Sequence, residues 1–399
     1  MPNEKPAKSA KVTKAKKPQP DAPKPPKNLK KRILVTLFVI FNVAIILWTA
    51  FSEFGDSENA ARLEDVEINI WLLLPAILLF LIGFGAEIYK NILMTRKCGD
   101  QKDWRVGART VILGRYYDNI TPAAVGGQPF QIHYMHTHGV KHGYAAIIPV
   151  VSLISTQLGF IIVAVFSYLF FGHLVDPAYL GLGVLGLIFY AIFPAGVTIA
   201  TFFPKLLSEI ISWVVKLLAK IHIVKDEEEA VEKTKSSIDN YANCVKKIAK
   251  NRTLVLQVLG LSVVFHVCIT MIPYFVLHAF GGSLGFFTSF TTTLAITAAV
   301  YITPTPGNSG FAEGFFFAVF KSLASGYVFW AMLFWRILTY YSYIFLGIIV
   351  YSLIAYETRT GRYFFTDAKK YLRKLRQKFQ KNLPERRKIP DEPEKESKN

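Results

Sequence analysis

Two ionisable side chains lie inside apolar stretches of this sequence, where a charge requires a partner. Arg336 lies about ten residues into the apolar run 327–355, and Glu313 lies in the apolar stretch just before that run. If the run crosses a membrane, Arg336 is roughly 15 Å from its end, near the bilayer centre. An arginine there costs at least about 2.5 kcal/mol on insertion scales, so we expect an anionic partner or ligand.

Two kinds of chemistry would satisfy these charges. Glu313 and Arg336 could form a purely structural ion pair. Alternatively, Arg336 could bind a lipid phosphate while Glu313 takes a proton or a cationic headgroup. Glu87 is a third acid near the inner end of an apolar stretch, and it either reaches the membrane interface or lines the same cavity. The sequence leaves these alternatives open.

Polar residues and glycines gather at two similar motifs that interrupt apolar sequence. The segments 119–130 and 301–313 both place Ile-Thr-Pro before a break that contains glycine, and both then continue as apolar sequence that suits a helix. Proline ends the incoming helix, and glycine permits a tight change of direction. Asp118 adds a polar side chain beside the first break. The predicted substrate-binding residues are Asn119, Thr121, Gly126, Gly127, Gln128, Gly307, Asn308, Gly310, Glu313 and Arg336.

The sequence predicts no catalytic residue, no metal site and no cofactor. One histidine-rich stretch consists of His133, His136, His138 and His142. No carboxylate lies near these histidines at the spacing of a metal site. The three cysteines show neither a CxxC motif nor paired spacing, and no Gly-x-x-x-x-Gly-Lys-[Ser/Thr] loop for ATP is present.

The elements that must position these residues are predicted to be membrane-spanning helices. Of all residues 52% are hydrophobic and only 19% are charged, and the charges avoid the long apolar blocks. A bilayer core of about 30 Å needs about 20 apolar residues in a helix. The sequence therefore predicts an all-α integral membrane protein with about six full transmembrane helices. The predicted spans are Ile33–Phe51, Ile68–Leu93, Ala145–Phe171, Tyr179–Phe203, Thr253–Phe280 and Tyr327–Ala355.

The two interrupted regions, 104–144 and 284–324, are predicted to be re-entrant helical hairpins. Three predicted spans separate them, so they should enter from opposite faces as an inverted repeat, a common plan of secondary transporters. Each outgoing helix would direct an N-terminus of about +0.5 charge toward the midplane, where an anion such as a phosphate could bind. The alternative is a pair of ordinary membrane helices kinked at proline.

The net charge of +18 is concentrated at the two ends of the chain. Residues 1–32, with 11 basic against two acidic residues, are predicted to be a disordered cytoplasmic tail, and 356–399, with 14 against seven, a second basic cytoplasmic tail. Residues 52–67 are acidic and should face outside, whereas 90–117, which begin with Lys90, are basic and should face inside. This distribution favours contact with anionic membrane lipids and argues against a nucleic-acid partner.

The motifs resemble the transmembrane, flippase-like domain of lysylphosphatidylglycerol synthases. The resemblance rests on residues 119–122 and 126–129, on 306–313, and on Arg336 followed by Tyr340. It covers about 33–355, the polytopic membrane domain. Asn308 and Ser309 stand where the family often has Gly-Leu, and Gln128 replaces an acid that many members carry.

The resemblance implies translocation of an anionic or aminoacylated phospholipid, or of a polyprenyl phosphate, between the leaflets of a bacterial cell membrane. The alternative is an enzyme or enzyme subunit that modifies a lipid headgroup, of the phosphatidylglycerol lysyltransferase type linked to cationic peptide resistance. Only 44 residues follow the last predicted span, so we expect no soluble aminoacyltransferase domain and expect a non-enzymatic role. A non-catalytic scaffold and a homo-oligomer also remain open.

Overall fold

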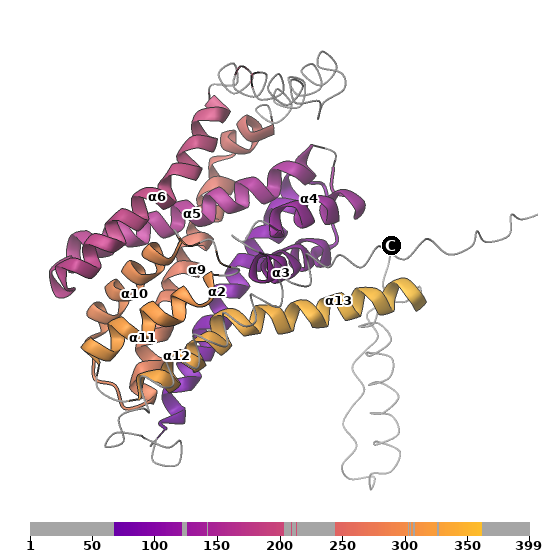
Figure 1. Cartoon of the computed structure of the whole chain (residues 1–399). Helices are drawn as coiled ribbons and strands as arrows, with labels where there is room; N and C mark the ends of the chain where they lie inside the picture. Colours follow the sequence, from indigo (N-terminus) through magenta and orange to yellow (C-terminus); the bar gives the residue numbers. More distant parts are fainter. Residues whose placement is uncertain are drawn as a thin grey trace, which may run out of the picture. The chain divides into compact units, whose positions relative to one another are not determined.

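The computed structural model describes residues 68–121, 126–141, 143–202, 209, 213, 244–301, 303, 305, 308–324 and 327–360. Within these ranges the regular structure is entirely helical (Figure 1). The first elements are α2 (Ile70–Lys97), α3 (Trp104–Ile120), α4 (Gly127–Thr137), α5 (Tyr144–Phe171), the short 3₁₀ turn η3 (Gly172–Leu174) and α6 (Pro177–Phe202). Then follow α9 (Arg252–Ala279), α10 (Phe286–Val300), α11 (Phe311–Leu323), α12 (Val328–Arg336), the π-helical turn η5 (Ile337–Tyr341) and α13 (Ser342–Thr360).

The described part of the chain contains five helices that are long and apolar enough to cross a membrane. They are α2, α5, α6, α9 and the continuous run of α12, η5 and α13. They confirm five of the six predicted spans, with ends that shift by a few residues. The sixth, Ile33–Phe51, lies outside the described residues, as do the basic tail 1–32 and most of the tail 356–399. The protein is a multi-pass, all-α membrane protein.

Local sequence signals set the ends of these helices. α2 begins at Asn69, whose side chain accepts a hydrogen bond from the Trp71 N–H at 3.2 Å, and it ends on Arg96 and Lys97. An Asn cap at the start and basic residues in the last turn are the ends that a helix dipole favours. Lys90 therefore lies two turns before the end of α2, within the helix. The predicted span Ile68–Leu93 includes Lys90, which also begins the basic stretch 90–117 that we expect to face inside.

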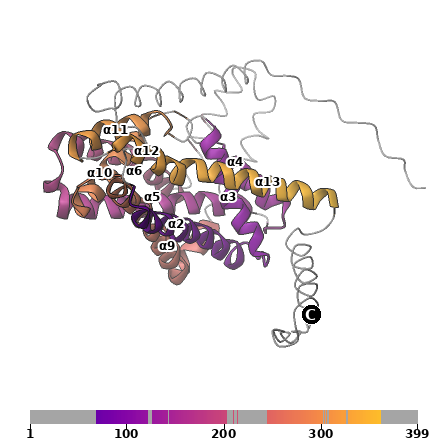
Figure 2. The ribbon, with the colours of Figure 1, turned by 90° about the horizontal axis from the view of Figure 1, so that it is seen from below.

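Close backbone approach holds the long helices together. α2 and α9 lie side by side over much of their length, and α5 packs on α9 (Figures 1 and 2). A Cβ at Gly83 would lie 3.1 Å from the Cβ of Cys268, and one at Gly159 would lie 2.8 Å from Ser262. Within lipid, such close packing through small residues supplies the dispersion energy that the hydrophobic effect cannot.

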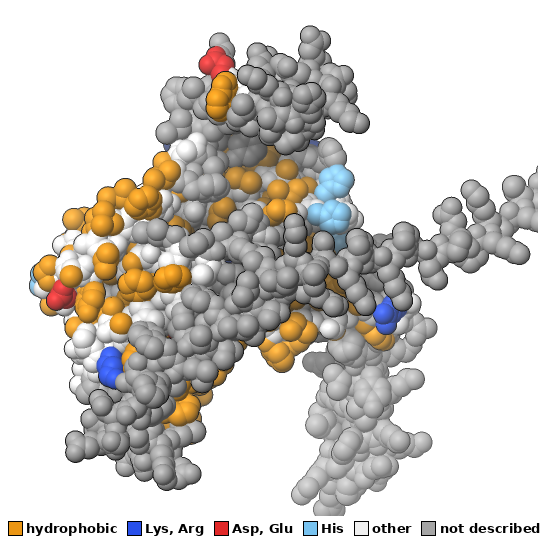
Figure 3. All heavy atoms as spheres, viewed as in Figure 1, with side chains coloured by type: hydrophobic (Ala, Val, Ile, Leu, Met, Phe, Trp, Pro, Cys, Tyr) orange, Lys and Arg blue, Asp and Glu red, His pale blue; other side chains and the backbone are white. Residues whose placement is uncertain are grey.

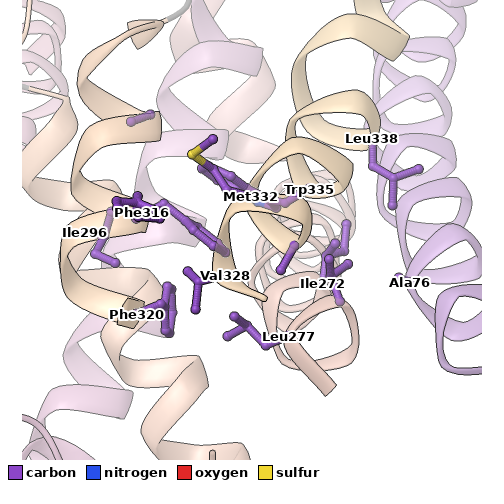
Figure 4. Close-up of a cluster of buried hydrophobic side chains, with 14 of the residues drawn as sticks. Ala76, Ile272, Leu277, Ile296, Phe316, Phe320, Val328, Met332, Trp335 and Leu338 are labelled. Carbon is purple, nitrogen blue, oxygen red and sulfur yellow. The ribbon is translucent and has the colours of Figure 1, made fainter. Parts of the chain in front are cut away.

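A cluster of buried apolar side chains joins α11 and α12 to α2, α9 and α10 (Figure 4). Phe316 of α11 stacks on Trp335 of α12, with ring centroids 4.6 Å apart. Phe320 and Met332 are fully buried in the same cluster, and so is Ile272 of α9. Because Glu313 lies one turn before Phe316, and Arg336 lies next to Trp335, this packing fixes both charged residues.

The outer surface of the helices is apolar. On α6, the side chains of Leu185, Ile188, Phe189 and Ile192 are each more than half exposed. Hydrophobic side chains cover the left side of the view in Figure 3, over the region that contains α6. Large exposed apolar side chains on consecutive turns of a helix are typical of a surface that faces lipid.

The chain is interrupted at both places where the sequence predicted a break. α3 ends at Ile120 and α4 begins at Gly127, and α10 ends at Val300 and α11 begins at Phe311. α4 folds back on α3, since a Cβ at Gly114 would collide with the side chain of Gln131. α10 and α11 also pack on each other. The prolines of the breaks, Pro122, Pro304 and Pro306, lie outside the described residues.

Candidate functional site

A cavity of about 940 Å³ lies where the two breaks meet the long helices. Four of the predicted binding residues line it, namely Asn119, Gln128, Asn308 and Arg336. Its wall also includes polar side chains of α5, α9 and α10. Of the other predicted residues, Gly307 lies outside the described part of the chain, and the remaining five shape or support the wall.

At the first break the chain satisfies its own backbone. The Gly127 N–H donates to Oδ1 of Asp118 at 3.0 Å, and the Gly126 N–H donates to Oγ1 of Thr121 at 2.9 Å. A Cβ at Gly127 would collide with the Asp118 carboxylate. Gly126 has an ordinary helical conformation, with φ −74°. Glycine is therefore needed at 127 to admit the carboxylate, and the conformation at 126 does not require glycine.

At the second break a carboxylate again caps the helix. The Gly310 N–H donates to Oε2 of Glu313 at 2.6 Å, and Oγ of Ser309 donates to Oε1 at 3.2 Å. Gly310 has φ +89° and Asn308 has φ +56°, the left-handed region that glycine and asparagine tolerate best. Here the conformational freedom of glycine is used as the sequence predicted.

Glu313 also forms the predicted pair with Arg336. Nη2 of Arg336 donates to Oε2 at 2.9 Å, and Nε lies 2.8 Å from Oε1, although its N–H is poorly aligned for a hydrogen bond. Nη2 also reaches the carbonyl oxygen of Asn308 at 3.4 Å. Both residues are buried, with 3% and 5% of their surfaces exposed. The pair therefore links α12 to the break that precedes α11.

The last span connects the two breaks. Arg336 ends α12 and the π-helical turn η5 follows at once. Within this turn, the hydroxyl of Tyr340 donates to the carbonyl oxygen of Asn119 at 3.1 Å. The end of α12 thus contacts the second break through Arg336, and the turn η5 that follows it contacts the first break through Tyr340. π-Helical turns are rare and occur frequently at functional sites.

Side-chain carboxylates accept hydrogen bonds from N–H groups at the starts of α4 and α11. The sequence predicted that both outgoing N-termini are available for an external anion. In the structure Asp118 already accepts from the first N–H of α4, and Glu313 accepts from the N–H that precedes α11. A side-chain carboxylate satisfies these donors and opposes a second negative charge. One N–H at each helix start is thus already occupied by a side-chain carboxylate.

Arg115 of α3 places a positive charge in the cavity, and it was not among the predicted binding residues. Arg115 lines the cavity, and 29% of its side chain is exposed, compared with 6% for Arg336. Its guanidinium lies 5.2 Å from the centre of the Phe265 ring. Its nearest carboxylate contact among the described residues is Nη2 to Oε1 of Glu87 at 3.7 Å, which is beyond hydrogen-bond distance.

A buried polar cluster surrounds Glu87. Glu87 lines the cavity and is 5% exposed, so it does not reach the membrane interface. Nζ of Lys90, which is fully buried, lies 2.8 Å from Oε2 of Glu87 and 2.6 Å from Oγ1 of Thr156. His266 lines the cavity beside them. The sequence does contain a signal for this cluster, namely a Glu and a Lys three residues apart in an otherwise apolar span.

The histidine-rich stretch does not form a metal centre within the described residues. No group of three His, Cys, Asp or Glu side chains there is placed to hold a metal ion. His138 instead contacts the carbonyl oxygen of Tyr134 through Nδ1 at 2.8 Å. His142 lies outside the described residues.

Comparison with known proteins matches most of this chain to one family. Residues 33–347 match the family model of the lysylphosphatidylglycerol synthase TM region. The chain is also similar to a UPF0104 membrane protein of Archaeoglobus fulgidus, with 27% identity over 307 residues that cover 71% of this chain and 88% of the relative. The matched region includes both breaks, Arg115 and Arg336.

Proposed function

The chain belongs to the lysylphosphatidylglycerol synthase TM region family, and from this premise we propose that it moves an anionic lipid between the two leaflets of a membrane. The lipid is a phospholipid or a polyprenyl phosphate. Its headgroup crosses through the cavity while its acyl chains stay in the surrounding bilayer. The observation that carries this proposal is a membrane cavity with two arginines, of which Arg115 has only a long ion-pair contact, 3.7 Å to Glu87, and is the more exposed of the two.

The charges of the cavity favour a phosphate group. Arg336 is neutralised by Glu313 at 2.8 Å, whereas Arg115 is 3.7 Å from Glu87, whose charge is already matched by Lys90. A guanidinium presents a planar fork of donors that suits phosphate oxygens. Arg115 is therefore the first anchor for the headgroup, and Arg336 is a second anchor that can exchange Glu313 for phosphate.

The broken helices support a path across the bilayer. At 1.5 Å per residue, α10 and α11 reach only about 20 Å each, and α4 still less, so none of them spans a bilayer alone. We propose that α3 with α4 and α10 with α11 form two re-entrant hairpins that enter from opposite faces. Irregular backbone at membrane depth is tolerated where it lines a cavity, and residues beside the first break and within the second line the cavity here.

The lipid tails need a route beside the cavity. Phe189 of α6 lines the cavity and is also 59% exposed. Its neighbours one turn away, Leu185 and Ile192, are exposed apolar residues of the same helix. We propose that the headgroup enters beside α6, where the cavity borders the apolar surface, so that the acyl chains need not leave lipid.

Purified full-length protein in liposomes tests this function. The assay follows fluorescent phosphatidylglycerol, lysylphosphatidylglycerol and polyprenyl phosphate between leaflets, with lipid extracts analysed for new products. We expect leaflet exchange of an anionic lipid without change to its headgroup. Inorganic phosphate, added as a competitor, distinguishes a lipid site from a site for a soluble anion. A new lipid product would favour the headgroup-modifying enzyme, and neither movement nor product would favour a scaffold.

Arg115→Gln is the first variant to compare. Because it removes the more exposed of the two anchors, we expect transport to fall about tenfold or more, as the loss of a charge-assisted hydrogen bond of about 1.5–3 kcal/mol would cause. Lys321→Gln is the matched control, since Lys321 is an exposed cation on α11 that does not line the cavity. Equal transport by wild type and Arg115→Gln would contradict the assigned anchor.

A further inference from the structure

The Glu87 carboxylate lies between two cations that hold it very differently. Its Oε2 is 2.8 Å from Nζ of Lys90, and Lys90 is fully buried among further oxygens, the Thr156 hydroxyl at 2.6 Å and the Ser262 hydroxyl at 3.2 Å. Lys90 cannot leave this position without losing every partner. Its ammonium group is thus fixed behind the wall of the cavity.

Arg115 holds the other carboxylate oxygen only loosely. The distance from its Nη2 to Oε1 of Glu87 is 3.7 Å, too long for a hydrogen bond, and Arg115 is partly exposed in the cavity. The guanidinium can therefore turn toward an incoming anion by rotating its own side chain. When it does so, Glu87 loses one of the two cations that favour its ionised form.

Resting on the proposed function, we propose that Glu87 is a proton-binding site coupled to the anionic headgroup. Binding of the phosphate draws Arg115 away from Glu87, and Oε1 of Glu87 then takes one proton from the water in the cavity. The cavity gains one negative and one positive charge together, and no bond other than the O–H bond forms. Electroneutral loading avoids placing an uncompensated charge in a medium of low dielectric constant.

Other titratable groups face the same cavity. Asp118 lies one turn from Arg115, but its Oδ1 accepts from the Gly127 N–H, a hydrogen bond that favours the ionised form. Among the described residues no backbone N–H donates to Glu87 in the same way, so Asp118 is the poorer candidate for this proton.

A histidine and three phenols near Glu87 are poorer candidates as well. Nε2 of His266 on α9 lies 2.9 Å from the carbonyl oxygen of Thr156, which can only accept, so Nε2 already carries a hydrogen and only Nδ1 could take the proton. Phenols remain protonated near neutral pH, so they have no proton to gain. The phenols that feel the charge of Glu87 are Tyr190 on α6, Tyr301 after α10 and Tyr343 on α13.

Calorimetry of the purified full-length protein in detergent tests the coupling. The probe is short-chain phosphatidylglycerol, whose phosphodiester stays singly charged near neutral pH. Titration in two buffers of different ionisation enthalpy counts the protons that binding takes up. We expect about one proton per ligand, so that affinity strengthens as pH falls by up to about tenfold per pH unit. Binding without proton uptake would overturn the coupling and leave the proposed function standing. Neither binding nor lipid movement would overturn both.

The site of the proton is tested by removing both members of the buried pair. Glu87→Gln alone would leave Lys90 buried without a counter-charge, so the double variant Glu87→Gln/Lys90→Met is the suitable form. We expect it to bind the probe with no proton uptake and with an affinity that does not change with pH. His266→Gln is the control and should keep the uptake. Uptake that persists in the double variant, or disappears in His266→Gln, would assign the proton elsewhere and overturn the inference.

Discussion

Glu313 and Arg336 are buried together, and the Glu313 carboxylate also caps the break before α11. Removing one charge of a buried pair leaves the other uncompensated, at a cost of about 3–5 kcal/mol, whereas removing both costs much less. We therefore expect Glu313→Gln to lower the thermal midpoint in detergent far more than Glu313→Gln/Arg336→Met does. Equal midpoints for the single and double variants would contradict a stabilising pair.

The same double variant separates the two roles that the sequence leaves open for this pair. If the pair is structural only, the folded double variant should move lipid at the wild-type rate. If Arg336 is an anchor for phosphate, it should move lipid at least about tenfold more slowly, because a charge-assisted contact is lost. We expect the slower rate, measured by leaflet exchange in liposomes at matched protein content.

Gly127 gives a second prediction for a single residue. A Cβ at this position would meet the Asp118 carboxylate that accepts from the Gly127 N–H. Gly127→Val should therefore displace Asp118 and open the start of α4, at a cost of about 1–3 kcal/mol for the lost cap and the added crowding. Gly181→Val on α6 is the control, because no atom lies within 4 Å of a Cβ there. Thermal midpoints that fall equally in both variants would contradict this account.

The individual charges of the site could be predicted only in part from the sequence. Arg336 and Glu313 were recognisable because each lies far from any polar flank, where a charge demands a partner. Lys90 was not recognisable as a buried charge, because a lysine near the end of an apolar stretch resembles a flanking residue. Only the length of α2 shows that Lys90 is enclosed. Arg115 lies in a sequence of mixed polarity, and its position in the cavity depends on how α3 packs.

At the scale of elements, the π-helical turn η5 joins the two halves of the site. The spans and the two breaks followed from hydropathy and from proline and glycine, which act locally. The turn η5 had no such signal, because it depends on contacts from Arg336 and Tyr340 to segments far away in the chain. The carboxylates that occupy both helix starts also went unpredicted, since Asp118 reaches Gly127 across the break.

Tyr340→Phe tests whether η5 couples the two breaks. The variant removes the hydroxyl that donates to the Asn119 carbonyl and also hydrogen-bonds with Ser309 of the second break, at about 1 kcal/mol for each bond. We expect a small loss of thermal stability, and a transport rate that falls several-fold if movement of one break must follow the other. Tyr351→Phe on α13 is the control, since Tyr351 is 60% exposed and lies away from the cavity. Wild-type transport by Tyr340→Phe would show that the breaks move independently.

At the scale of the whole molecule, the proposed path requires that each broken pair of helices returns to the face from which it entered. A re-entrant hairpin places both of its outer ends on one side, whereas a kinked span places them on opposite sides. Lys102 and Thr137 flank α3 and α4, and Ser283 and Lys321 flank α10 and α11, and all four are exposed. Their accessibility therefore separates the two arrangements.

Single cysteines at these four positions, in a chain whose own cysteines are replaced by serine, would be labelled from each side of the membrane with a charged thiol reagent. Where Cys98 must be kept for folding, its background should be low, because burial raises the pKa of its thiol and the thiolate is the reactive form. We expect Lys102→Cys and Thr137→Cys to react from one side only, and Ser283→Cys and Lys321→Cys only from the other. Labelling of Lys102→Cys and Thr137→Cys from opposite sides would establish a kinked span. The first break would then have no reason to meet the second in mid-membrane, and the proposed route for the headgroup would be lost.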